Sequence, residues 1–376
     1  MMCERPENSV RVLVVGQTPP PYGGQAIMIQ KLLEGNYKRI ELFHVRMSFS
    51  KEMGEAGSFK LHKILELLKV IVMITRARLK YRPQILYYPP SGPKFWPVLR
   101  DIAILAATRW MFPKVVFHFH AGGLGNYYTK LPSILKPLFR KAYFNPAAAI
   151  HLSKYSPSDG ESIQAGRIYV IPNGIEDVYP TYSDYKGQFN QTPVILFVGA
   201  LYESKGVFDL LHAAHILKSQ GYRFQMRLMG QGSEEMETAI RNFISENGLN
   251  VSVKLIGVKI GDEKWREFAI ADIFCFPTYF EAETFGVVLL EAMMFGLPIV
   301  ATRWRGIPAL VKDGENGFLV PIKTPEELAE KLKLLLDDKC LRKSMGRRGR
   351  EIFLKEYTID KFRERMEQVF LEVYNG

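Results

Sequence analysis

Short apolar runs alternate with helical patterns along most of the chain. Runs at 10–15 (VRVLVV), 85–88 (ILYY), 115–120 (VVFHFH), 148–152 and 169–171 are rich in β-branched and aromatic residues, which is typical of buried strands. Segments of helical periodicity lie between most of these runs. An alternation of this kind predicts a parallel sheet that is covered by helices on both faces.

A polar stretch at 176–192 (EDVYPTYSDYKGQFNQT) interrupts the alternation and is interpreted as a linker. Beyond it the alternation resumes, and the region from 325 to 376 is charged and helical. The pattern therefore predicts two α/β domains, with ligands at the carboxyl ends of their strands. In the second half, the predicted strands are 194–200, 224–230, 251–257, 272–276 and 298–302, and the helices include 207–219 and 234–246.

The segment 279–298 (YFEAETFGVVLLEAMMFGLP) contains three carboxylates, of which Glu283 and Glu291 bracket an apolar run and the third, Glu281, is left without an assigned role. Thr284 is a candidate N-cap for a helix that begins at Phe285 and is apolar on nearly every face, so we expect this helix to be buried. An ionised carboxylate that leaves water costs free energy unless it has partners. The hydroxyls of a polyhydroxylated ligand would serve. In the alternative interpretation, one glutamate caps the helix and the other pairs with a distant arginine.

Composition adds limits to this picture. The 376 residues are 47% hydrophobic and 24% charged, as in ordinary soluble proteins, and the length favours two domains. The three cysteines form no CxxC pair, which argues against a disulfide framework or a zinc knuckle and fits a reducing compartment. No run approaches the ~20 apolar residues of a membrane span, and the first residues do not resemble a signal peptide. We therefore expect a cytoplasmic location.

Positive charge is concentrated in the first half. Residues 1–180 contain 24 Lys/Arg and 12 Asp/Glu, a difference of +12, whereas residues 181–376 contain 26 and 27, a difference of −1. The asymmetry favours an anionic partner such as a membrane surface, a phosphorylated acceptor or a nucleic acid, although no nucleic-acid motif accompanies it. Segments 59–82 and 129–144 combine apolar stripes with cations and could lie against an anionic membrane. In the alternative, the stripes pack on the sheet and only the cations are exposed.

The segment from Glu283 to Glu291 resembles the signature of two glutamates separated by seven residues in the retaining GT-B glycosyltransferases of family 4, the glycosyl transferases group 1. The resemblance covers nearly the whole chain. It implies a GT-B fold in which a Rossmann-like domain at 1–178 binds the acceptor and a Rossmann-like domain at 190–357 binds the nucleotide sugar. The last helix, 359–376, would cross back to the first domain. The other matching segments are PPPYGGQA (19–26), HFHAGG (118–123), IPNGIE (171–176), FVGALYESKG (197–206), LMGQGSE (228–234) and KDGENGFLV (312–320).

The activity implied by the resemblance is transfer of a sugar, with retention, from a UDP- or GDP-sugar to an acceptor such as a lipid-linked oligosaccharide in cell-surface polysaccharide biosynthesis. His120 would contact the donor sugar, Lys205 would stabilise the leaving diphosphate, Glu283 would bind the sugar and Glu291 the ribose. The catalytic residues would thus be His120, Glu283 and Lys205, and the donor-binding residues Gly23, Gly24, Lys205, Gly230, Gly232, Glu283, Phe285, Gly286 and Glu291.

Two positions depart from the family pattern. Ala200 stands where an arginine of the diphosphate clamp is usual, with Arg303 and Arg305 as candidate replacements, and Ala309 stands where a glutamate is common. No DxD motif occurs, so we expect neither a metal nor another required cofactor. A nucleotide-sugar epimerase of GT-B fold and a catalytically impaired sugar- or membrane-binding module are the alternatives.

Overall fold

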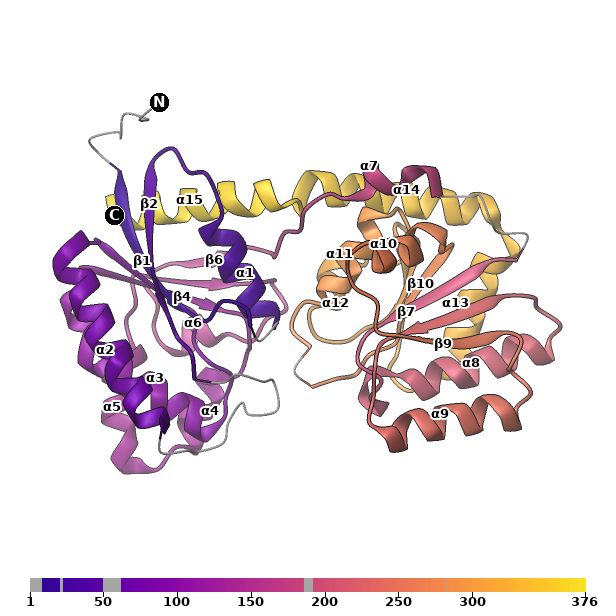
Figure 1. Ribbon diagram of the computed structural model, residues 1–376, viewed down its shortest axis with the longest axis horizontal. Helices are drawn as coiled ribbons and strands as arrows, with labels where there is room; N and C mark the ends of the chain where they lie inside the picture. The colour runs from indigo at the N-terminus through magenta and orange to yellow at the C-terminus, as the bar shows by residue number, and fades with distance from the viewer. Residues whose placement is uncertain (1–8, 21–22, 50–61, 186–191, 282) are drawn as a thin grey trace. The chain divides into compact units, whose positions relative to one another are not determined.

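The computed structural model describes residues 9–20, 23–49, 62–185, 192–281 and 283–376, which form two compact units (Figure 1). One unit comprises Met1–Asn173 and Asp360–Gly376, and the other comprises Gly174–Ile359. Each unit contains a parallel sheet with flanking helices. The predicted α/β class, with two Rossmann-like sheets, is therefore confirmed.

The described part of the first unit has a six-stranded sheet of order β2-β1-β3-β4-β5-β6, parallel throughout. The sequence pattern did not predict β2, because this edge strand is largely half-exposed and lacks a continuous apolar run. The strands are β1 (Val10–Gly16), β2 (Ile40–Arg46), β3 (Ile85–Tyr88), β4 (Lys114–Phe119), β5 (Ala148–His151) and β6 (Ile168–Val170).

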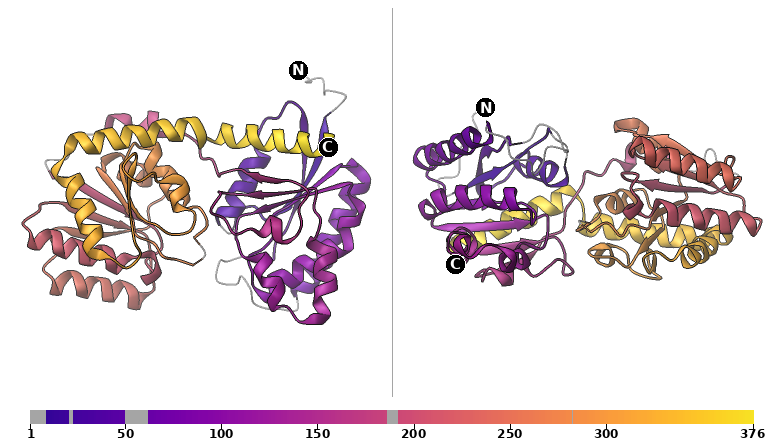
Figure 2. Two further views of the ribbon diagram at one scale, coloured as in Figure 1. Left: turned by 180° about the vertical axis from the view of Figure 1, so that it is seen from behind. Right: turned by 90° about the horizontal axis from the view of Figure 1, so that it is seen from below.

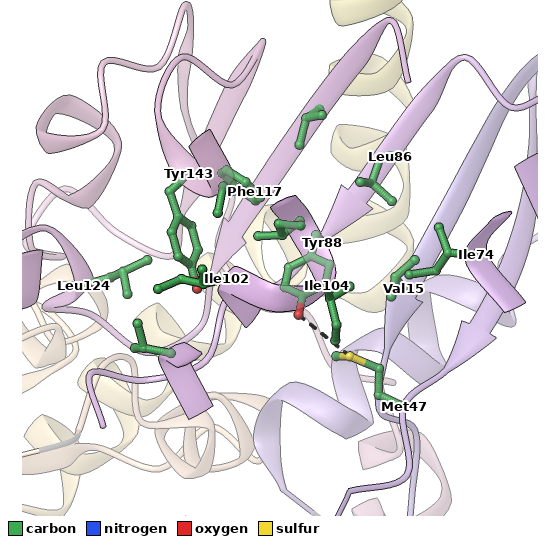
Figure 3. Close-up of a cluster of buried hydrophobic side chains, with 14 of the residues drawn as sticks. Val15, Met47, Ile74, Leu86, Tyr88, Ile102, Ile104, Phe117, Leu124 and Tyr143 are labelled. Atoms are coloured by element: carbon green, nitrogen blue, oxygen red, sulfur yellow. Dashed lines mark hydrogen bonds between the residues drawn. The ribbon is translucent and has the colours of Figure 1, made fainter. Parts of the chain in front are cut away.

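Helices α2, α3 and α5 cover one face of this sheet (Figure 1). Their inward side chains pack on Leu86, Tyr88 and Phe117 in one buried cluster (Figure 3). Within it, the Tyr88 hydroxyl donates a hydrogen bond of 2.8 Å to the buried carboxylate of Asp101. The longer helices of the unit are α1 (Gly24–Leu33), α2 (His62–Tyr81), α3 (Phe95–Thr108), α4 (Leu124–Lys130), α5 (Lys136–Tyr143) and α15 (Ile359–Asn375).

Helix α15 packs on the first unit although it lies at the end of the sequence (Figure 2). The Arg363 guanidinium donates to the backbone carbonyl of Lys31 at 3.0 Å. Phe370 meets the ring of Tyr87 edge to face, with ring centroids 5.8 Å apart. Side chains alternate along a strand, so Tyr87 and Tyr88 lie on opposite faces of the sheet. Helix α15 therefore packs on the face opposite to the one that α2, α3 and α5 cover.

The described part of the second unit has a six-stranded parallel sheet of order β12-β11-β10-β7-β8-β9. Its strands are β7 (Val194–Val198), β8 (Gln225–Met229), β9 (Val253–Gly257), β10 (Ile273–Phe276), β11 (Ile299–Thr302) and β12 (Gly317–Val320). Its longer helices are α8 (Val207–Ser219), α9 (Glu234–Glu246), α10 (Gly261–Ile270), α11 (Val287–Met294), α13 (Pro325–Asp337) and α14 (Lys339–Glu356).

The interpretation of 176–192 as a plain linker is wrong for its described middle part. Tyr179–Tyr182 form the short helix α7, and the Tyr182 hydroxyl donates to the carboxylate of Asp262. The Tyr182 ring also lies 6.4 Å from that of Phe295. The contacts of Tyr182 attach the segment to the second unit. The polar composition of the segment did not indicate these contacts. Residues 186–191 lie outside the described part of the chain.

Candidate active site

The two glutamates of the signature lie between β10 and the end of α11, but the helix begins later than the sequence predicted. Its first residue is Val287, and Gly286 is the N-cap with φ = 74°. A backbone in this left-handed region is strained for residues other than glycine, so the chain turns at Gly286 before the helix starts. The prediction that Thr284 caps a helix starting at Phe285 is therefore wrong. Phe285 is buried ahead of the helix, against Tyr357.

Glu283 pairs with Lys205. Its Oε2 lies 2.6 Å from Nζ of Lys205, and both side chains are largely buried. The lysine ammonium also lies 4.6 Å from the ring centroid of Phe280, which adds a cation–π contact. Lys205 follows β7 and Glu283 follows β10, and these strands are neighbours in the sheet. The carboxyl ends of adjacent parallel strands thus bring together two residues that are distant in sequence.

Lys205 is held in place by the glycine that follows it. Gly206 has φ = 75°, and a Cβ there would lie 2.1 Å from the carbonyl oxygen of Pro277. No side chain fits at that distance, so glycine lets the loop after β7 lie directly against the loop after β10. This close approach puts the ammonium of Lys205 within reach of Glu283.

Glu291 pairs with Lys264, a residue that the sequence analysis missed. Oε1 of Glu291 accepts a hydrogen bond of 2.6 Å from Nζ of Lys264. Oε2 has no hydrogen-bond partner among the described residues, although Glu291 is only 8% exposed. Both signature glutamates therefore meet a distant cation, as one alternative anticipated, but the cations are lysines and neither glutamate was found to cap the helix. Lys264 lies 27 positions before Glu291 in the sequence. The only sign of such a partner in the sequence is that a buried carboxylate needs a cation.

Burial raises the pKa of the Glu291 carboxyl, and the ammonium of Lys264 offsets part of that rise. A carboxyl whose pKa is higher in the folded state binds protons more readily there, so its ionisation near neutral pH opposes folding. We expect the melting temperature of the wild type, relative to that of Glu291→Gln, to increase as the pH falls from 7 towards 5. A constant difference would show that the lysine balances burial, and a difference that decreases with falling pH would show that the lysine outweighs it. Melting curves of both proteins across this range decide the sign.

Packing between loops requires glycine at Gly230 and Gly232, which the sequence did not indicate. A Cβ at Gly230, whose φ is 151°, would lie 1.8 Å from the carbonyl oxygen of Gly199, and one at Gly232 would lie 2.7 Å from that of Leu201. Both glycines therefore allow the loops after β7 and β8 to pack against each other. Gly24 differs, because a Cβ there would meet no atom of the described residues within 4 Å.

Gly23 and Gly24 lie at the start of α1. Gly23 is the N-cap, with an extended backbone, and Gly24 is the first helical residue. The amides of a first helical turn have no partner within the helix and favour negative ligands. Since packing does not require glycine at Gly24, the open space beside it leaves room for a ligand at these amides.

His118 and His120 lie at the carboxyl end of β4 with their rings on the same side, as expected for two residues separated by one position in a strand. Their centroids are 4.1 Å apart, and Nδ1 of His118 lies 2.8 Å from the hydroxyl of Tyr87. Burial lowers the pKa of His120 to about 4 and holds that of His118 well below its usual range. Both imidazoles are therefore neutral near pH 7. They belong to the first unit and the lysine–glutamate pairs to the second, so a shared role stays a prediction.

The two arginines considered for the missing cation have other contacts, and so does Asp338 at the start of α14. Arg303 lies 3.3 Å from a carboxylate oxygen of Asp313 and is mostly exposed, and the guanidinium of Arg305 lies 5.4 Å from the ring centroid of Trp304. Asp338 caps α14 by accepting from the amide of Leu341. Within the described ranges, no group of three or more His, Cys, Asp or Glu residues is arranged to hold a metal ion.

Comparisons with known proteins agree with this fold. Residues 180–352 match the family described as glycosyl transferases group 1. An uncharacterized glycosyltransferase of Methanocaldococcus jannaschii is 32% identical over 224 residues, which is 59% of each chain. The capsular polysaccharide biosynthesis glycosyltransferase CapM of Staphylococcus aureus is 29% identical over 190 residues, 50% of this chain and 48% of CapM. The chain thus spans about half to three fifths of these relatives.

The fold likeness extends over both units. Anabaena HepE, whose structure was solved in complex with UDP, aligns with a TM-score of 0.73 over 96% of this chain and 100% of its own, at 16% sequence identity. At that identity the likeness concerns the fold alone. Residues 180–352 therefore match the glycosyl transferases group 1 family, and the chain shares its two-domain Rossmann-like fold, of the GT-B type, with HepE.

Proposed function

We propose that the protein is a retaining glycosyltransferase that moves a sugar from a UDP- or GDP-sugar to a glycan acceptor, such as a lipid-linked oligosaccharide in cell-surface polysaccharide biosynthesis. The observation that carries the proposal is the pair of buried glutamates, Glu283 and Glu291, each held by a lysine at 2.6 Å. Carboxylates fixed in this way accept hydrogen bonds from the hydroxyls of a nucleotide sugar. The names of relatives such as CapM support the class of product.

Each residue then has a defined role. Glu291 accepts from the ribose hydroxyls and Glu283 from the donor sugar, which the amides of Phe285 and Gly286 also support. Lys205 turns from Glu283 to the diphosphate as negative charge develops on the leaving group. The donor needs no metal in this proposal, because lysine and helix N-termini supply the positive potential.

The first unit contributes to the same reaction in this proposal. His120, neutral at physiological pH, forms a hydrogen bond with the donor sugar. The amides of Gly23 and Gly24 approach a phosphate at the start of α1. The acceptor binds to this unit, whose positive charge suits a phosphorylated or membrane-bound molecule.

A thermal-shift screen with UDP, GDP and their sugars tests the donor site, because a ligand that binds the folded state raises its melting temperature by mass action. We expect one nucleotide and its sugars to do so, and no shift with any nucleotide would contradict the proposal. Incubation of the stabilising nucleotide sugar without an acceptor separates the epimerase alternative, which would convert the sugar on its own. Donor binding without transfer to any lipid or glycan acceptor would favour the impaired module.

The surface of α2 supports a peripheral location at the inner face of the cell membrane. Leu65, Leu68, Val72 and Leu79 are 72%, 55%, 47% and 73% exposed, and their spacing places them on one stripe of the helix. Glu66 is the one acidic residue in the sequence from 62 to 81, which contains five Lys or Arg. In the described part of the chain, no helix has the length and hydropathy needed to cross a bilayer.

Replacing Leu65 and Leu79 together with serine is expected to reduce binding to vesicles of phosphatidylcholine and phosphatidylglycerol by about tenfold or more, since each leucine buries apolar surface worth ~1.5–3 kcal/mol when fully covered. Both positions are exposed, so the melting temperature should change little. Val251→Ser, at an 86% exposed position of the second unit, is the matched control. Equal sedimentation of wild type and double variant with the vesicles would contradict a membrane role for α2.

A further inference from the structure

Lys264 is placed by a group of aromatic rings. Its ammonium lies 4.8 Å from the ring centroid of Trp265 and 6.0 Å from that of Phe268. Both rings stack on Phe295, which directly follows α11, with centroids 6.1 and 5.7 Å away. Stacked rings in a packed interior leave few alternative rotamers. The aromatic group therefore fixes α10 against the end of α11 and directs the ammonium of Lys264 to Glu291.

Glu291 is held at one oxygen only. Nζ of Lys264 engages Oε1 at 2.6 Å, whereas Oε2 makes no hydrogen bond with the described residues. Leaving a buried polar atom unsatisfied destabilises a protein, and native structures seldom do so without a functional reason. Because Oε2 is covered in this conformation, an external hydroxyl reaches it only after a small side-chain movement.

Fixing one oxygen of a carboxylate also fixes where the other lies. The ion pair sets the rotation of the Glu291 carboxylate, and it opposes the effect of burial, which favours the protonated form. A protonated or freely rotating carboxyl would be a poorer acceptor for a ligand hydroxyl. The lysine thus supports the acceptor without needing to touch the ligand.

We propose that Lys264 is a positioning residue for the donor nucleotide, which holds Oε1 of Glu291 so that Oε2 accepts a hydrogen bond from a ribose hydroxyl. This inference rests on the proposed function, in which Glu291 binds the ribose. It assigns to α10 a part in nucleotide recognition, and it makes the preference for a ribose with free hydroxyls depend on a residue outside the signature segment.

Nucleotide binding to Lys264→Met tests the inference. Calorimetry would compare UDP or GDP, whichever binds, with its 2′,3′-dideoxy counterpart. We expect the wild type to prefer the ribonucleotide, and Lys264→Met to reduce that preference about tenfold while affinity for the dideoxynucleotide changes less than about twofold. Lys264→Arg should retain most of the preference, and in a Glu291→Gln background the methionine should have little further effect. Lys333→Met, at an exposed position of α13, is the control.

The outcomes separate this inference from the proposed function. If Lys264→Met weakens both nucleotides equally, the lysine has only a structural role and the inference is wrong. If it strengthens ribonucleotide binding, Lys264 competes with the ribose for Glu291, and the inference is wrong as well. Failure of the wild type to bind any nucleotide would instead overturn the proposed function. A melting temperature close to that of the wild type shows that the variant is folded, and Lys264→Arg provides the test if it is not.

Discussion

Lys205→Met is expected to lower kcat for sugar transfer by about 100- to 1,000-fold, the range observed when one group that stabilises developing negative charge is removed. The loss should be large because the loop after β7 has Ala200 where the family pattern has a second cation, and the candidate replacements Arg303 and Arg305 contact Asp313 and Trp304 instead. Lys205 is therefore the principal cation for the diphosphate in the proposed site. A loss that appears in kcat more than in KM is the mark of an interaction made chiefly in the transition state.

The substitution also leaves Glu283 without its partner, so stability and catalysis have to be measured separately. Removing one member of a buried ion pair lowers the free energy of unfolding, because the remaining charge is buried without a partner. The double variant Lys205→Met/Glu283→Gln removes that charge, and it should recover melting temperature without recovering turnover. Arg348→Met, at an exposed ion pair with Glu315, is a matched loss of a cation on the same unit. Turnover by Lys205→Met within about threefold of wild type would exclude the diphosphate role.

The sequence was sufficient for the parts of the fold that depend on local pattern. Buried strands such as β3 and β10 are continuous apolar runs. Both faces of a parallel sheet are covered by helices, so every position of such a strand favours an apolar side chain. Strands β2 and β12 were missed for different reasons. The first is half-exposed along much of its length, and the second has four residues after a polar turn.

The start of α11 shows where local preference fails. Thr284 is a good N-cap by type, yet the backbone continues to Gly286 before it becomes helical. A Cβ at Gly306 would lie 2.0 Å from the carbonyl oxygen of Thr284, so a second loop passes directly against this turn. The late start of the helix is therefore associated with this contact between two loops, which the capping preference of threonine does not predict.

The candidate site was foreseen in its acidic half and only partly in its basic half. Two glutamates among apolar residues stand out in sequence, because burial of a carboxylate is costly wherever it occurs. Lys205 was found through a resemblance in its own loop. Lys264 was not found, because it is one of several charged residues in α10, and its pairing with Glu291 arises only when α10 and α11 pack together.

Gly230→Ala is expected to destabilise the second unit by about 3–5 kcal/mol, which corresponds to a fall in melting temperature of about 10 °C or more. The new Cβ would overlap the carbonyl oxygen of Gly199, 1.8 Å away, and the φ of 151° is strained for alanine. The overlap involves backbone on both sides, so no side chain can rotate to relieve it. The loops after β7 and β8 would have to separate, and Lys205 lies in the first of them.

Gly24→Ala is the matched control for that substitution, and it distinguishes a glycine required by packing from one that leaves room for a ligand. Within the described part of the chain, a Cβ at Gly24 meets no atom within 4 Å, and alanine is the better helix former, so stability should be unchanged or rise by about 0.4–1 kcal/mol. If a phosphate approaches the amides at the start of α1, turnover should nevertheless fall.

Calorimetric melting and donor turnover of both variants provide the comparison. A melting temperature for Gly230→Ala within about 2 °C of wild type would show that the two loops separate at little cost. Unchanged turnover in Gly24→Ala would remove the first helix from the proposed donor site.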